Sequence, residues 1–129
     1  EPHHPVSHHA NDPVQLEKLS KINKYHVSLF GYLLEKLDSV DEGNGTLLDN
    51  TTYLMGSGMG NPDVHDHSNL PIVVASGANT GIHGGRHISF QEQQPLANLH
   101  LSLLDSMGVH LESFADSSGR MDELFHQTA

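Results

Sequence analysis

The sequence predicts an α/β fold: a partial three-layer sandwich with a short mixed or parallel sheet, one long amphipathic helix, a Gly-rich hairpin and a second, shorter helix. Apolar residues recur at three- and four-residue steps over residues 13–37 and again over 96–107, which is the period of an amphipathic helix. A short β-prone run, 51–55, and a nearly continuous apolar run, 70–75, lie between these segments. Because the apolar residues in these runs are continuous rather than alternating, the runs are typical of strands covered on both faces. The 129 residues fit a single domain, 1–129.

The first helix has clear start and stop signals. Asp12 is a good N-cap, Pro13 suits the first helical position, and Gln15 stands where a capping box places its second member. The spacing then predicts one helix from Pro13 through Leu37. We expect it to end before residues 41–45, where two glycines permit positive φ and the other side chains are polar.

The later elements follow from similar signals. The second strand leads into a Gly-rich stretch, in which the Gly84-Gly85 pair predicts a two-residue turn and a small hairpin. Pro95 opens the second helix, and Gly108 lies where a C′ residue belongs.

Charge and composition exclude several classes of partner and site. Sixteen acidic and six basic residues give a formal charge of -10, and no Lys/Arg cluster is available to neutralise a phosphate backbone, so we expect no nucleic-acid partner. No apolar run approaches the length of a membrane span. The chain contains no Cys, so any metal must be held by nitrogen and oxygen ligands.

Histidine is the outlying residue type, and its distribution is grouped. Four of the twelve His residues precede residue 10, and His4, His8 and His9 frame the run His-Pro-Val-Ser-His-His. Neutral imidazole is a common ligand for zinc and related metals, and a loop with several can converge two or three nitrogens on one ion. The alternative is a solvated His-rich leader or a purification artefact.

A second group, His65, Asp66 and His67, stands directly before the second predicted strand. Ligands of open α/β sheets often bind at such strand edges. In an extended segment His65 and His67 would point to the same side, with Asp66 either a ligand or the orienting partner of one. The alternative is an ordinary polar loop with exposed His residues.

The roles of three residues in the Gly-rich stretch stay open. Arg86 could clamp an anionic oxygen, and His83 or His87 could face the site, but a simple turn explains this stretch equally well. Elsewhere, His26 lies on the apolar stripe of the first helix, which favours a hydrogen-bonded core residue. His110 lacks a partner at useful spacing and is interpreted as a surface residue.

These motifs resemble those of a family of uncharacterised exported bacterial proteins named for its HxxSHH motif. The resemblance starts at the His4–His9 run. It continues through Gly45-Thr-Leu-Leu-Asp-Asn, Gly56-Ser-Gly-Met, His65-Asp-His-Ser-Asn-Leu-Pro and Gly84-Gly-Arg-His to Leu103-Leu-Asp-Ser-Met-Gly. It implies an exported or periplasmic protein of which this chain is the C-terminal portion.

More distantly, the layout is similar to the end of the sulfatase and alkaline-phosphatase superfamily. That similarity implies a divalent-metal site, with zinc the first expectation, and hydrolysis of small phosphate or sulfate esters. His4 and His8 share the four-residue spacing of one ligand pattern, and His65 or His67 stands at another ligand position. The superfamily's Asp-His pair is replaced here by Gly58-Met59, and its nucleophile has no counterpart in this chain.

The sequence therefore predicts a metal-binding, hydrolase-like domain and leaves its enzymatic activity open. The expected ligands are His4, His8, His9, His65, Asp66 and His67. The alternative is a non-catalytic metal- or carbohydrate-associated binding module that keeps the fold, or a folded piece in which the His residues never converge. Exposed strand edges also lead us to expect a homo-oligomer of this chain.

Overall fold

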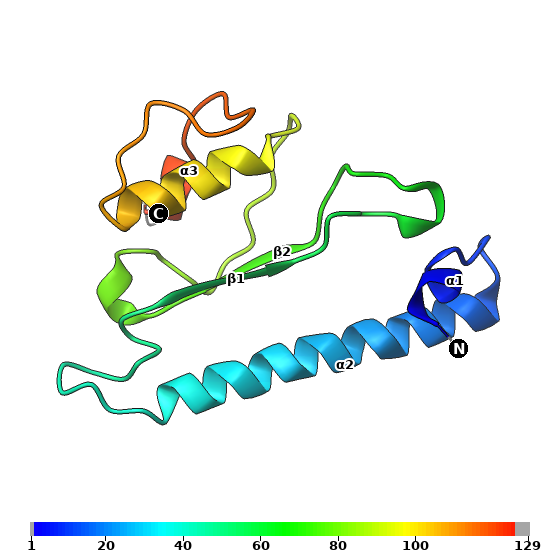
Figure 1. Cartoon of the computed structure of the whole chain (residues 1–129), viewed down its shortest axis with the longest axis horizontal. Coiled ribbons are helices and arrows are strands. Elements are labelled where there is room, and N and C mark those ends of the chain that lie inside the picture. Colours follow the sequence, from blue (N-terminus) through cyan, green and yellow to red (C-terminus); the bar gives the residue numbers. More distant parts are fainter. Residues whose placement is uncertain (1, 126–129) are drawn as a thin grey trace.

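The computed structural model describes residues 2–125. A long helix lies on one side of a two-stranded ribbon, and a shorter helix lies on the other (Figure 1). The elements in chain order are α1 (His3–Ser7), α2 (Pro13–Asp38), β1 (Thr52–Gly56), η1 (Pro62–Val64), β2 (Ile72–Ser76), η2 (Ala78–Thr80), α3 (Leu96–Ser106) and η3 (Asp122–Leu124), where η marks a 3₁₀ turn. The mixed α/β character agrees with the expectation from sequence. Close backbone contacts between elements are concentrated between β1 and β2 and between α1 and α2.

The sheet of the described chain is antiparallel, not parallel or mixed. Thr52 pairs with Ser76 and Gly56 with Ile72, and β1 and β2 are its two strands. The connection between them, residues 57–71, contains a single 3₁₀ turn and folds back on itself. Parallel strands need a crossover, usually a helix, and this connection has none. Continuous apolarity was thus an unreliable guide to strand direction.

Helix α2 begins where the sequence predicts. The Asp12 carboxylate accepts hydrogen bonds from the backbone N–H groups of Val14 (2.7 Å) and Gln15 (3.3 Å). The reciprocal half of the predicted capping box is missing, because the Asp12 N–H donates to the His9 carbonyl oxygen and the buried Gln15 Oε1 has no partner. His26 is exposed on this helix, its ring 6.3 Å from that of His3, so its assignment to the core was wrong.

The predicted Gly84-Gly85 hairpin does not form. Residues 81–94 contain no strand. Two of these residues, His83 and Arg86, instead make hydrogen bonds to the C-terminal segment. The His83 N–H donates to the Leu124 carbonyl oxygen (3.0 Å), and the Arg86 guanidinium donates to the carbonyl oxygens of His83 and Glu123. The bonds to Leu124 and Glu123 are tertiary contacts, and they take the place of the ladder that a hairpin would have made.

Helix α3 and the segment after it form the best-packed part of the described chain. The helix ends in a Schellman motif: Gly108 has a φ of 80°, and the Val109 N–H donates to the Leu104 carbonyl oxygen (3.0 Å). Buried apolar side chains from α3 and its two neighbouring segments share this core: Ile82, Ala97, Leu99, Leu101 and Leu124. No helix within residues 2–125 combines the length and apolarity needed to cross a membrane.

Candidate metal site

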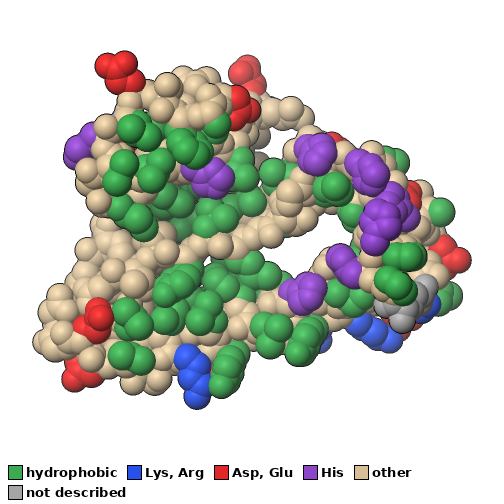
Figure 2. Space-filling model, viewed as in Figure 1, with side chains coloured by type: hydrophobic (Ala, Val, Ile, Leu, Met, Phe, Trp, Pro, Cys, Tyr) green, Lys and Arg blue, Asp and Glu red, His purple; other side chains and the backbone are tan. Residues whose placement is uncertain are grey.

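Two histidines far apart in the sequence meet at one point. His8 is the C-cap of α1, and His65 is the C-cap of the η1 turn in the β1–β2 connection. Their Nε2 atoms lie 3.1 Å apart, and their ring centroids lie 4.8 Å apart. The His4 ring packs edge-on against His8 at 4.7 Å between centroids. Figure 2 shows His side chains gathered over this end of the molecule.

The orientation of the His8 ring is set by a backbone carbonyl. His8 Nδ1 lies 3.2 Å from the Asp63 carbonyl oxygen. Since a carbonyl oxygen only accepts, Nδ1 of the neutral ring carries the hydrogen, and Nε2 keeps its lone pair. The Nε2 lone pair therefore faces the His65 ring. A carbonyl behind a ring in this way is the usual means of orienting a metal-ligating His.

Asp63 joins the two segments that carry the pair. Its carboxylate accepts a hydrogen bond from the Ala10 N–H (2.8 Å), while its own N–H donates to the Asn61 side chain (3.1 Å). The Asp63 carbonyl oxygen thus positions the His8 ring, and the Asp63 carboxylate positions the backbone at Ala10. No local sequence pattern reveals a partner more than fifty residues away, so this role of Asp63 becomes visible only in the structure.

His65 has left-handed backbone torsions, with φ at 55° and ψ at 36°. This conformation is sparsely populated for residues other than glycine, although His is among those that adopt it more often. Two hydrogen bonds of 2.9 Å hold the turn: the Gly60 N–H to the Asp66 carbonyl oxygen, and the Asp66 N–H to that of Asn61. The segment is therefore not extended, and the expectation that alternation places His65 and His67 on one side does not apply.

The other predicted ligands make contacts elsewhere. His9 is buried, and its Nδ1 accepts a hydrogen bond from the Asn11 N–H (3.1 Å). The exposed His67 donates from Nδ1 to the Gly58 carbonyl oxygen (2.7 Å), which leaves its Nε2 lone pair facing away from that bond.

Asp66 is occupied in a local turn. Its carboxylate accepts from the Ser68 hydroxyl (2.9 Å) and the Ser68 N–H (2.8 Å). These bonds, the hydroxyl first, hold the pKa of Asp66 below its ordinary value. Asp66 therefore stabilises the turn that carries His65.

The His8–His65 pair brings together two ring nitrogens that lie at hydrogen-bonding distance and that could serve as two metal ligands. No cluster of three or more His, Asp or Glu side chains able to hold a metal ion occurs among residues 2–125. Two bonds of about 2.05 Å to a tetrahedral zinc ion place the ligand nitrogens about 3.3 Å apart. The 3.1 Å separation of the two Nε2 atoms is close to that value, so the pair fits one ion while its other coordination positions stay open to water or an anion.

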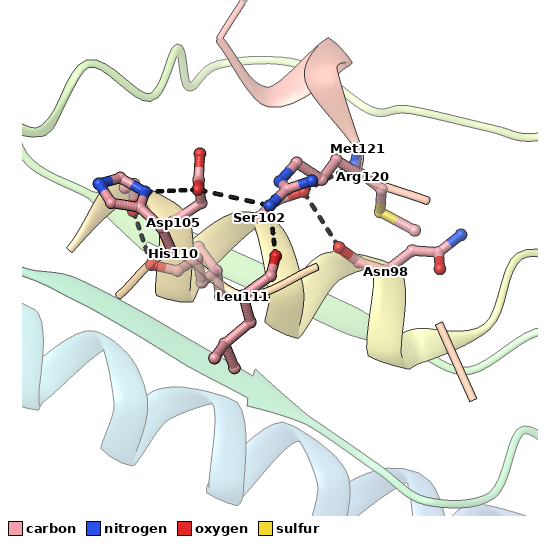
Figure 3. Close-up of polar contacts among 9 residues, drawn as sticks. Asn98, Ser102, Asp105, His110, Leu111, Arg120 and Met121 are labelled. Atoms are coloured by element: carbon pink, nitrogen blue, oxygen red, sulfur yellow. Dashed lines mark hydrogen bonds and ion pairs between the residues drawn. The ribbon is translucent and has the colours of Figure 1, made fainter. Parts of the chain in front are cut away.

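A further polar cluster, absent from the sequence interpretation, lies at the end of α3 (Figure 3). His110 Nδ1 is 2.7 Å from an Asp105 carboxylate oxygen, and Arg120 lies 3.5 Å from the same oxygen. Arg120 also donates to the Leu111 carbonyl oxygen (2.6 Å). His110 is thus exposed, as expected, but it has a partner. The cluster fastens the segment after α3 to the helix.

Comparisons of this chain with protein-family models, with curated proteins and with solved structures found no match.

Proposed function

We propose that this chain binds a divalent transition-metal ion, zinc first among the candidates, through Nε2 of His8 and Nε2 of His65. The observation that supports this most directly is their 3.1 Å separation across 57 residues of sequence. The carbonyl oxygen behind His8 and the turn that presents His65 supply the orientation that such a site needs.

The wider proposal is a hydrolase-like domain acting on small phosphate or sulfate esters outside the cytoplasm. Its support is the resemblance to the exported HxxSHH family and, more distantly, to the sulfatase and alkaline-phosphatase superfamily. In that setting the β1–β2 ribbon would belong to a larger mixed sheet of a three-layer domain. A bound divalent ion would supply Lewis-acid polarisation of the ester oxygen, and the residues of this chain would hold and orient it.

The second candidate is a metal- or carbohydrate-associated binding module without catalysis. Two observations favour it: the Asp66 carboxylate is engaged by Ser68, and Gly58-Met59 stands where the superfamily carries an Asp-His pair. Both candidates share the His8–His65 site and differ in whether an ester is cleaved there.

Titration of the 129-residue chain with Zn²⁺ and Co²⁺, followed by calorimetry and by Co²⁺ absorption, tests the metal site. We expect one ion per chain, and at least about a hundredfold weaker binding in His8→Ala and in His65→Ala because a site with two protein ligands loses half of them. His87→Ala, an exposed His in residues 81–94, is the matched control and should bind as the parent does. Unchanged binding in both site variants would refute the proposal.

A screen against generic phosphate and sulfate esters, with and without chelator, separates the two candidates. Chelator-sensitive cleavage that disappears in His65→Ala supports the hydrolase. Metal binding without cleavage of any ester supports the binding module.

A further inference from the structure

A cavity of about 300 Å³ lies between the C-terminal end of α3 and the η2 turn (Figure 1). This volume is at the lower end of the range found for small-molecule sites. The cavity lies where β1 begins and β2 has ended, whereas His65 lies in the connection at the other end of the ribbon. It is therefore separate from the candidate metal site. Its lining consists of Asn50, Thr52, Asn79, Thr80, Ser106 and Met107.

Hydroxyl groups beside this cavity form a chain whose direction is fixed at one end. The Thr80 hydroxyl donates to the Gly77 carbonyl oxygen (2.8 Å). Because a hydroxyl carries a single proton, the Ser76 hydroxyl then donates to Thr80 (2.6 Å) and the Thr52 hydroxyl donates to Ser76 (2.7 Å). Thr52 Oγ1, at the start of the chain, therefore offers only lone pairs to a further partner.

The two amide side chains of the lining have also committed their protons. Asn79 Nδ2 donates to the Asn44 carbonyl oxygen (3.1 Å) and to Asn50 Oδ1 (2.9 Å). Asn50 Nδ2 lies within 3.2 Å of three acceptor oxygens, on Glu42, Asn44 and Thr46, and its two protons are shared among them. The Asn79 side chain therefore has only the lone pairs of its Oδ1 atom to offer a ligand.

The end of α3 contributes a further acceptor. The Ser106 hydroxyl donates to the Leu103 carbonyl oxygen (2.8 Å), and the Met107 N–H donates to that of Leu104 (3.1 Å). With these bonds, every side-chain proton on the polar lining residues is engaged by an acceptor within the described chain. The lining side chains thus offer oxygen lone pairs and no free donor.

The charges around the cavity favour a cation. None of the lining residues is Lys, Arg or His, and the chain carries a formal charge of -10. The Glu42 carboxylate lies behind the lining, where it accepts from Asn50 (3.1 Å). Ser106 and Met107 are the last residue and the C-cap of α3, the end at which a helix dipole is negative. An anion would find neither a positive side chain nor a free side-chain proton in this lining.

We propose that this cavity binds the primary ammonium group of a small organic amine. An ammonium group brings three donors and no acceptor, which complements a lining of acceptors. Hydroxyl, carboxylate, phosphate and sulfate groups bring lone pairs for which the lining side chains have no proton. Met107, 63% exposed, supplies an adaptable apolar surface for the carbon chain of the amine. The site is thus distinct in place and in ligand charge from the proposed metal and ester site.

A titration of the 129-residue chain with butylammonium, followed by NMR at constant ionic strength and at about pH 7, tests the proposal. The amine is charged at this pH. The backbone amide signals of Asn79, Thr80 and Met107 should shift and saturate at millimolar concentrations. Butanol and butyrate should leave these signals in place. Tetramethylammonium, which has the charge but no donor, should bind at least about tenfold more weakly.

Ser106→Ala removes one acceptor and should weaken butylammonium binding about tenfold, the usual value of a hydrogen bond to a charged group. Ser39→Ala is the matched control: the Ser39 hydroxyl makes the same kind of bond at the end of α2, to the Lys36 carbonyl oxygen (2.7 Å), but Ser39 does not line the cavity. That variant should bind as the parent does. Circular dichroism establishes that both variants keep their helix content.

Four results would overturn the proposal. They are the absence of a saturable shift with butylammonium, equal binding of tetramethylammonium, binding of butyrate or butanol at the same signals, and equal affinities in Ser106→Ala and Ser39→Ala. Because the titration needs no metal and the His8–His65 pair does not line the cavity, each of these results leaves the metal proposal to its own test.

Discussion

At the scale of single residues, the backbone conformation of His65 matters most to the candidate site. Its left-handed torsions turn the chain at the end of η1 and bring its imidazole to His8. Residues held in such regions cost of order 1 kcal/mol and persist because the surrounding structure fixes them. Here the fixing contacts are the two backbone hydrogen bonds between residues 60–61 and Asp66.

Gly60 gives a test of this turn. A Cβ on Gly60 would collide with the carbonyl oxygens of Ser68 and Asn69, while one on Gly58 would meet nothing within 4 Å. We expect Gly60→Ala to force the two sides of the turn apart, lower the free energy of unfolding by about 1–3 kcal/mol and weaken Zn²⁺ binding by at least about tenfold. Gly58→Ala should do neither. Calorimetric titration and urea unfolding measure both effects, and equal affinities in the two variants would contradict the role given to the turn.

At the scale of elements, α2 has few buried side chains, so its N-cap is expected to matter to its stability. Several of its large side chains are exposed, and Leu37 is the residue of this helix that is buried. A helix with little tertiary packing depends on local contributions. The Asp12 carboxylate supplies one of these, by satisfying two N–H groups that the helix geometry leaves without partners.

Asp12→Ala should therefore lower the free energy of unfolding by about 1 kcal/mol, the usual cost of losing an N-cap. Asp12→Asn keeps a side-chain oxygen at the same place and is expected to retain most of that stability. Urea unfolding followed by helical circular dichroism measures the difference. A loss in Asp12→Asn as large as that in Asp12→Ala would show that the hydrogen-bonding oxygen is not what stabilises this end.

The whole molecule carries several carboxylates whose charged form the fold favours. The His110 side chain first, then Arg120, lowers the pKa of Asp105; Thr46 lowers that of Asp49, and Lys21 that of Glu17. A carboxyl group whose pKa is lower in the folded chain adds stability above its unfolded pKa, which is 3.8 for Asp and 4.5 for Glu. That stability is lost as the pH falls through the folded pKa.

The contribution of these carboxylates to the melting temperature should thus be lost as the pH drops below about 4.5. Asp105→Asn should melt lower at neutral pH and show a smaller drop on acidification, because its contribution is already missing. Asp116→Asn, at an exposed position in the same C-terminal segment, is the control and should follow the parent. Thermal melts from pH 7 to pH 3 provide the measurement, and an Asp105→Asn curve parallel to the parent's would exclude the Asp105–His110 contact as a source of acid sensitivity.

The sequence by itself determined the elements whose signals are local. It predicted helix α2 from Asp12, Pro13 and the apolar period, and helix α3 with its Gly108 end, because caps, φ restrictions and helical spacing act within a few residues. It also placed both strands to within a residue or two. It singled out the two His groups, since the clustering of a residue type is visible without coordinates.

Only the tertiary structure decided how these pieces meet. The antiparallel pairing of β1 and β2 depends on how residues 57–71 fold back, and the missing hairpin depends on hydrogen bonds from His83 to Leu124 and from Arg86 to Glu123. Of the six predicted ligands, the structure joins His8 to His65, with His4 packed alongside, and gives His9, Asp66 and His67 other partners. Contacts between distant residues depend on the path of the whole chain, and no local pattern encodes that path.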